Sequence, residues 1–168
     1  MTEIALTLQR ATPQNFSDFG AIITPSGREA ELSGEEFNWW EKRAVIPLGE
    51  EAEVGLVEAK NTGSYEQKTL EQHRFTSEVL IPVDNDVFLV LGRPEAFSGT
   101  GPQAADVAAF CIPRGCIVAL KEGVWHQGPM TLADRAGVFV VYRGKTGIQD
   151  KVVRNMADCG VHITVAEL

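Results

Sequence analysis

The sequence predicts an all-β fold, a sandwich or barrel of short strands in a single domain over residues 1–168. Its length is ordinary for one domain, and no repeat, low-complexity tract or long linker marks a boundary. From Glu53 onward, short β-rich runs follow one another at close spacing, separated by glycine and proline turns. Apolar residues make up 44% of the chain, which is enough to bury a core.

The expected elements begin with a strand over Ile4–Leu8. Thr12 and Pro13 are typical of a helix N-cap and first helical residue, and Gly20 would close that short helix. A strand over Ala21–Ile23 leads into a Pro25-Ser26-Gly27 turn, and the polar, acidic residues 28–38 predict a surface loop. Further strands are expected over Val54–Ala59, Glu78–Val83, Val87–Leu91, Ala108–Ile112, Cys116–Leu120, Val138–Tyr142 and Val161–Val165.

Two connections allow finer predictions. Asp84-Asn85-Asp86 lies between two β-rich runs, a pattern that predicts a hairpin. The segment Gln149–Cys159, followed by Gly160, predicts one or two helical turns.

Trp39 and Trp40 are adjacent, so in a strand their side chains would point to opposite sides. Either both take part in ordinary core and edge packing, or one of them lines the barrel or a dimer contact.

Charge and composition exclude several classes of function. The formal net charge is −8, which argues against a nucleic-acid binder and against docking on anionic membranes. No apolar run is long enough to span a membrane, and the N-terminus lacks the features of a secretory signal. The odd set Cys111, Cys116 and Cys159 predicts small buried thiols rather than disulfides, which fits a reducing cytoplasm.

Histidine is scarce, and that limits where acid–base or metal chemistry can lie. The chain has only His73, His126 and His162. Strand alternation puts His162 on the same face as Thr164 and opposite Val161 and Ile163, which predicts a surface position. The candidates for chemistry are therefore His73 and His126.

The first candidate segment runs from Glu71 to Pro82. In a strand, Glu71 and His73 share a face, whereas Glu78 joins them only if a turn or bulge intervenes near Phe75–Ser77. A carboxylate, an imidazole and a second carboxylate in one pocket provide acid–base partners or metal ligands. The alternative is a solvated strand face that happens to carry a histidine.

The second candidate segment runs from Gly115 to His126. Gly123 permits a tight turn, Trp125 supplies a large apolar wall, and His126 enters the next strand beside it. Taken alone, His126 fits a buried core histidine as well as a catalytic one.

Together the two segments resemble the motifs of the cupins. Gly115, Gly123 and His126 reproduce the spacing of the second cupin motif, with Lys121 in place of its proline. Glu71, His73 and Glu78 follow the first motif, with Glu71 in place of its first histidine. The resemblance covers residues 71–126 and implies a double-stranded β-helix barrel with a few short helices.

Within the cupins, the chain resembles the ureidoglycolate lyase family. The similar patches are His73 with Ser77, Glu78 and Leu80-Ile81-Pro82, the stretch Val124-Trp125-His126-Gln127-Gly128-Pro129, and the early Phe16-Ser17-Asp18-Phe19-Gly20. The chain departs from the family pattern in having Glu78 for a glutamine and Gln127 for a second histidine. Glu78 thereby adds a charge and a possible metal ligand.

The resemblance implies cleavage of ureidoglycolate to glyoxylate and urea, as part of allantoin degradation in purine metabolism. This reaction needs a base, an acid and a cation that binds the substrate carboxylate. We expect His73 and His126 to be the acid and base, with Glu78 tuning His126 or sharing the proton. The expected substrate contacts are Lys60 or Lys121 as the carboxylate clamp, Arg43 as a further candidate, and Trp125 to exclude water. The family also implies a homodimer.

The need for a metal and the exact reaction stay open at this point. His73, Glu78 and His126, with Glu71 as a further ligand, form a set that suits Fe, Mn, Ni or Zn, but a metal-free acid–base pocket fits equally. One alternative is a metal-dependent cupin isomerase or dioxygenase for a small hydroxy or sugar acid, which Glu78 favours. Another is a non-catalytic cupin that binds a small ligand.

Overall fold

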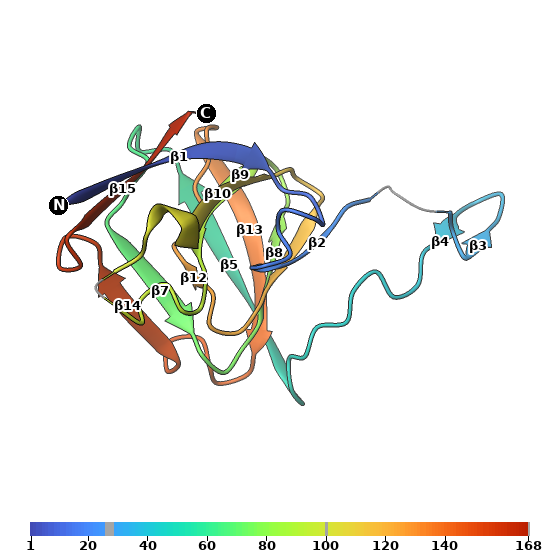
Figure 1. Cartoon of the computed structure of the whole chain (residues 1–168). Helices are drawn as coiled ribbons and strands as arrows, with labels where there is room; N and C mark the ends of the chain where they lie inside the picture. Colours follow the sequence, from blue (N-terminus) through green and yellow to red (C-terminus); the bar gives the residue numbers. More distant parts are fainter. Residues whose placement is uncertain (26–28, 100, 168) are drawn as a thin grey trace.

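In the computed structural model, which describes residues 1–25, 29–99 and 101–167, the β-rich runs form two sheets wound into a barrel (Figure 1). The first strands are β1 (Thr2–Arg10), β2 (Gly20–Ile23), β3 (Leu32–Ser33), β4 (Asn38–Trp39), β5 (Ala52–Lys60), β6 (Glu66–Gln67), β7 (Thr69–His73) and β8 (Glu78–Pro82). They are followed by β9 (Val87–Gly92), β10 (Val107–Ile112), β11 (Ile117–Leu120), β12 (Trp125–His126), β13 (Arg135–Arg143), β14 (Lys151–Asn155) and β15 (Val161–Glu167). The all-β prediction is confirmed.

The two sheets are built by a chain that passes repeatedly from one to the other. One sheet has the order β14-β7-β12-β9-β10-β1-β15-β6, and the other has the order β2-β11-β8-β13-β5. Between β7 and β14, only the β9–β10 hairpin stays within one sheet. This winding is the predicted double-stranded β-helix.

The core lies between the sheets and is apolar because inward side chains alternate with outward ones along each strand. Phe16, Phe19 and Phe110 form an aromatic cluster there, with the Phe16 and Phe110 ring centroids 5.1 Å apart. Every residue of β9 is buried, so this strand is covered on both faces. β9 borders β12, and a rigid central strand therefore supports the strand that carries His126.

The predicted hairpin around Asp84–Asp86 is wrong, because β8 and β9 belong to different sheets. Carboxylate oxygens of this connection accept hydrogen bonds from the backbone N–H groups of Gly137 and Arg114. The polar residues therefore fasten a crossing between the sheets instead of closing a two-strand turn.

The predicted helices are also corrected. Residues 13–19 form successive turns, and Lys151–Asn155 is strand β14, paired antiparallel with β7. The only helix within the described residues is a 3₁₀ turn over Ala104–Asp106. A strand pairing that comes from far along the chain overrides a weak local helical pattern at residues 149–159.

One segment leaves the barrel. Residues 29–51, called the arm below, extend to the right of the barrel in Figure 1 and carry the small β3–β4 hairpin at their far end. The loop predicted over residues 28–38 thus contains a hairpin within its described part. Ser26 and Gly27 of the predicted turn, and residue 28 of the loop, lie outside the described residues.

The remaining expectations concern cysteines and membranes. Cys111, Cys116 and Cys159 are free thiols, and burial raises the pKa of the Cys111 and Cys116 thiols. These two side chains therefore stay in the weakly reactive thiol form at neutral pH. No helix in the described ranges has the length and apolar character needed to cross a bilayer.

Candidate active site

A cavity of about 270 Å³ opens between the two sheets at the end of the barrel where β7, β12 and β13 meet. Its polar lining comprises Glu71, His73, Glu78, His126, Gln127, Tyr142 and Lys151, and its apolar lining includes Leu80 and Val140. A larger cavity of about 390 Å³ lies at the Asp84–Asp86 connection, but its described lining contains no histidine. Both carboxylates of that connection are engaged by backbone N–H groups.

Strand alternation and strand pairing bring the four candidate side chains together. Glu71 and His73 point from one face of β7, and β12 pairs with β7 so that His126 lies opposite Glu71. The chain then turns through residues 74–77 and enters the other sheet, where Glu78 begins β8. The predicted turn before Glu78 is therefore present, and it is a crossing between the sheets.

Glu78 lies at the centre of the cluster. Its Oε2 is 2.8 Å from His126 Nε2, and its Oε1 is 3.6 Å from His73 Nε2. Glu71 Oε1 is 3.8 Å from His126 Nε2. The two imidazole rings are stacked, with centroids 5.6 Å apart. Both histidines are buried and line the cavity.

The buried Glu78–His126 pair favours its charged forms. Burial on its own would raise the pKa of Glu78, but the hydrogen bond to His126 and the electrostatic influence of His126, His73 and Lys151 together lower it. Burial on its own would lower the pKa of His126, but Glu78 raises it, with help from the Val124 carbonyl and Glu71. Both shifts favour a carboxylate paired with an imidazolium.

The Nδ1 atoms of His126 and His73 differ in their hydrogen bonding. His126 Nδ1 lies 3.0 Å from the carbonyl oxygen of Val124, so it carries a proton and directs Nε2 into the cavity. His73 Nδ1 is buried and has no hydrogen-bond partner within the described part of the chain. His126 is thus held in one orientation by its own strand, whereas His73 is held mainly by packing.

The donor set also fits a divalent transition metal. One oxygen or nitrogen atom from each of Glu71, His73 and His126 lies within 4.8 Å of the others. Two imidazoles with a carboxylate suit Fe, Mn, Ni or Zn, and the carbonyl that holds His126 Nδ1 is the outer contact common among metal-bound histidines. These residues are consistent with either a metal site or an acid–base pocket.

Lys151 is a pocket residue that sequence reasoning missed. It lies on β14 opposite His73, lines the cavity and makes an ion pair with Glu71. Tyr142 also lines the cavity, and partial burial and Glu53 raise the pKa of its hydroxyl. The signal for Lys151 was hidden because residues 149–159 have a locally helical pattern, which conceals the register of β14.

The structure does not bring the expected carboxylate clamps to the cavity. Lys60 is exposed and lies 3.6 Å from Glu58, whereas Lys121 Nζ donates to the carbonyl of Ser17. Arg43 lies on the arm and donates to the carbonyl of Thr24. These three predictions are corrected, because a suitable charge type does not reveal the direction in which a side chain points.

Trp125 is also absent from the cavity lining. It is adjacent to His126 on β12, so the two side chains point to opposite faces. Trp125 packs on Phe97 with centroids 4.5 Å apart, and its Nε1 donates to the carbonyl of Pro94. It therefore supports the strand from behind and does not exclude water from the pocket.

Two of the solved structures similar to this chain match about 60% of it. Oxalate decarboxylase of Bacillus subtilis aligns over 62% of this chain and 24% of its own, with a TM-score of 0.43 and 11% identity. RmlC from Streptococcus suis aligns over 58% of this chain and 46% of its own, with a TM-score of 0.44 and 10% identity. This chain thus spans about a quarter of the decarboxylase and under half of RmlC.

Sequence comparison reaches further along the chain. A curated ureidoglycolate lyase from Pseudomonas entomophila is 25% identical over 148 residues, covering 84% of this chain and 86% of that protein. One from Stutzerimonas stutzeri is 25% identical over 147 residues, covering 84% and 85%. The model of the family described as ureidoglycolate lyase matches residues 3–166. The chain therefore belongs to the ureidoglycolate lyase family.

Proposed function

We propose that this protein cleaves ureidoglycolate to glyoxylate and urea in the cavity lined by His73 and His126. The observation that carries the proposal is the buried Glu78–His126 pair with His73 stacked beside it. Membership of the ureidoglycolate lyase family supports the choice of substrate. The cavity of about 270 Å³ is of a size to hold a small hydroxy acid.

The reaction requires two proton transfers and breaks one C–N bond. His73 accepts the proton of the substrate carbinol hydroxyl, and the O–H electron pair forms the C=O bond of glyoxylate. The C–N bond breaks, and its electron pair stays on the urea nitrogen. His126 Nε2 donates a proton to that nitrogen, so urea leaves as a neutral molecule. The two histidines meet the geometric need, since their stacked rings present both groups to one small ligand.

Glu78 and Lys151 prepare the pocket for this chemistry. Glu78 keeps His126 protonated until the leaving nitrogen requires the proton. Lys151 supplies the cation for the substrate carboxylate, since it lines the cavity and its present partner, Glu71, lies in the same wall. These roles replace those expected of Lys60 and Lys121.

A divalent metal held by Glu71, His73 and His126 would supply a Lewis acid that polarises the substrate oxygen. The overall reaction is the same with or without this ion, because the substrate and the products do not change. The acid and base roles of the two histidines apply to the metal-free pocket, since a ring nitrogen bound to a metal cannot exchange a proton.

The test is glyoxylate release from ureidoglycolate by protein purified without a histidine tag, with and without chelator. We expect glyoxylate and urea in equal amounts, well above an enzyme-free control. No release above that control would overturn the proposed function. A panel of small sugar acids, tested for turnover, examines the isomerase and ligand-binding alternatives. Activity lost in chelator and restored by one metal would assign that metal to the pocket, whereas unchanged activity would assign metal-free chemistry.

We also propose three finer points that rest on family membership. The reaction belongs to allantoin degradation in purine metabolism, the protein works in the cytoplasm, and it does so as a homodimer. Free thiols with a raised pKa are compatible with a reducing compartment.

A further inference from the structure

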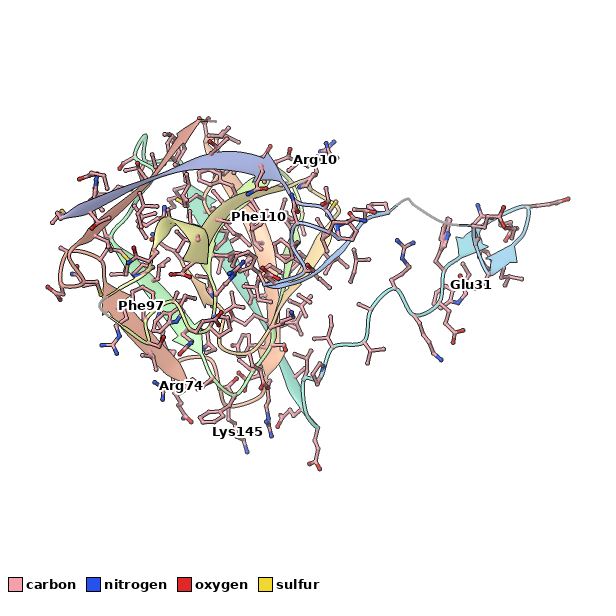
Figure 2. The ribbon with its side chains drawn as sticks, viewed as in Figure 1. Arg10, Glu31, Arg74, Phe97, Phe110 and Lys145 are labelled. Atoms are coloured by element: carbon pink, nitrogen blue, oxygen red, sulfur yellow. The ribbon has the colours of Figure 1, made fainter. Side chains whose placement is uncertain are left out.

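The arm, residues 29–51, projects from the barrel (Figure 1). Figure 2 shows its side chains, among them the labelled Glu31, well separated from the labelled core residue Phe110. Near its base, the Arg43 guanidinium donates to the carbonyl of Thr24, and the two tryptophans border a shallow pocket with Ile23 and Ile117. The β3–β4 hairpin projects away from the barrel (Figure 1), and Trp39 of β4 borders that pocket.

The hairpin of the arm cannot be stable on its own. Its strands have two residues each, and two backbone hydrogen bonds, from Glu31 N to the Trp39 carbonyl and from Gly34 N to the Phe37 carbonyl, flank them. Even longer isolated hairpins are marginal in water. Leu32, Phe37 and Trp39 are each more than half exposed, so apolar contacts among the described residues leave much of their surface uncovered. Such a hairpin needs a surface to rest on.

The barrel carries an apolar surface of matching character. On the outward side of the five-stranded sheet, Phe139 of β13 pairs with Leu56 of β5, and Val141 pairs with Val54. Val54 is 67% exposed, Leu56 65% and Phe139 42%. β5 is also the edge strand of its sheet, so one side of its backbone has no strand beside it. We call Val54, Leu56 and Phe139 the outer apolar face.

We propose that the arm of one copy of this chain lies over the outer apolar face of a second copy, and that the exchange is reciprocal. This deepens the homodimer proposed above and is independent of the lyase chemistry. A reciprocal exchange follows from a two-fold axis, which buries the same two surfaces on each protomer.

Three observations identify the second copy as the occupant. The arm runs directly into β5, so an axis near this junction brings each arm beside the partner's outer apolar face. β5 has nine residues and spans roughly 30 Å. The arm, at up to roughly 3.3 Å per residue, is long enough to follow it. Together, the arm and the outer apolar face supply about 20–30 residues from each protomer, which is the number that a standard interface uses.

Charge supports the same occupant. The hairpin tip carries Glu35 and Glu36, and the far end of the β5–β13 ladder carries the exposed cations Lys60 and Arg135 beside Glu58 and Asp134. Pairing of the acidic tip with these two cations would set the direction in which the arm lies.

The experiment is sedimentation velocity on the full chain over a range of micromolar concentrations. We expect wild type to sediment at twice its 18.3 kDa. The double variant Phe37→Ser/Trp39→Ser on the arm and Val54→Glu on the face should each weaken the dimer at least 10-fold. Val153→Glu is the matched control, because Val153 is an exposed valine on β14, the edge strand of the other sheet. It should leave the dimer unchanged.

A second readout is the emission of Trp39, which should shift to shorter wavelength as concentration rises and the residue becomes covered. Trp39→Phe should abolish that shift. A wild-type monomer at all concentrations would overturn the homodimer and the exchange together. A dimer that survives both the arm and the face variants would overturn the exchange alone. Ureidoglycolate cleavage, measured separately, decides the proposed function in either case.

Discussion

Two of the three histidines lie between two glutamates, and the comparison of these clusters shows what burial adds. His126 has Glu78 at 2.8 Å and Glu71 at 3.8 Å. His162 has Glu3 at 2.5 Å and Glu66 at 3.4 Å. The side chain of His126 is 7% exposed and faces a cavity, whereas that of His162 is 34% exposed on the barrel surface.

Histidine and glutamate therefore have different roles in the two clusters. Around His126, the charges attract one another in a region of low dielectric, where they can also act on a bound molecule. Around His162, solvent screens the pair, and its effect is to connect β1, β15 and β6. The pKa is raised in both, against burial for His126 and chiefly by the hydrogen bond to Glu3 for His162.

The largest expected difference between the clusters comes from removing an imidazole. His73→Ala removes the proposed base, so kcat/KM for ureidoglycolate should fall by about 10²- to 10⁴-fold, the usual contribution of a general acid or base. His162→Ala should keep near-wild-type activity. Circular dichroism of both variants checks folding. Equal losses in the two variants would show that the two clusters do not differ in function.

Lys151→Ala should have the next largest effect, and mainly on KM. Hydrogen bonds to charged groups contribute about 1.5–3 kcal/mol, and the partial exposure of Lys151 favours the lower end, so we expect KM to rise about 10-fold. The matched control is Lys60→Ala, since Lys60 is an exposed lysine beside a glutamate on the outer side of the barrel. Initial-rate kinetics on both variants decide whether Lys151 binds the substrate carboxylate.

Glu78→Gln should move the pH dependence of activity. Glu78 raises the pKa of His126, so an uncharged glutamine lowers that pKa and depletes the imidazolium at a lower pH. The high-pH limb of kcat/KM should therefore shift to lower pH. Glu3→Gln at the surface cluster should leave the profile unchanged. A limb that stays in place in Glu78→Gln would remove His126 from the role of acid.

The smallest effect concerns the pH dependence of stability at the surface cluster. Because the folded-state pKa of His162 is raised, its pairing stabilises the fold fully below the unfolded-state value of about 6.5. That stabilisation is lost as pH rises through the higher folded-state value. The Tm of wild type relative to His162→Gln should thus be greatest near pH 6 and fall toward pH 9. A difference that grows with pH would contradict this assignment.

Much of the candidate pocket was predictable because its signals are local. Strand alternation placed Glu71 and His73 on one face and required a turn before Glu78, and motif spacing linked both to His126. The same alternation, applied to Trp125 and His126, would have put the tryptophan outside the cavity. Trp125 was wrongly expected in the cavity because a residue adjacent in sequence was treated as a neighbour in space.

The rest depended on pairings between distant segments. Lys151 reaches the pocket only because β14 pairs with β7, and β8 separates from β9 only because other strands pair with each of them. A polar composition predicted an exposed loop after residue 28, but nothing local showed that part of it forms a hairpin away from the barrel (Figure 1).

The most direct test of the central claim is the yield of glyoxylate and urea from ureidoglycolate by wild type and by His126→Ala at equal folded concentration. Wild type should release the two products in equal amounts, and His126→Ala should release both at least about 100-fold more slowly, because the leaving nitrogen has lost its proton donor. A folded His126→Ala protein that releases both products at the wild-type rate would contradict the account.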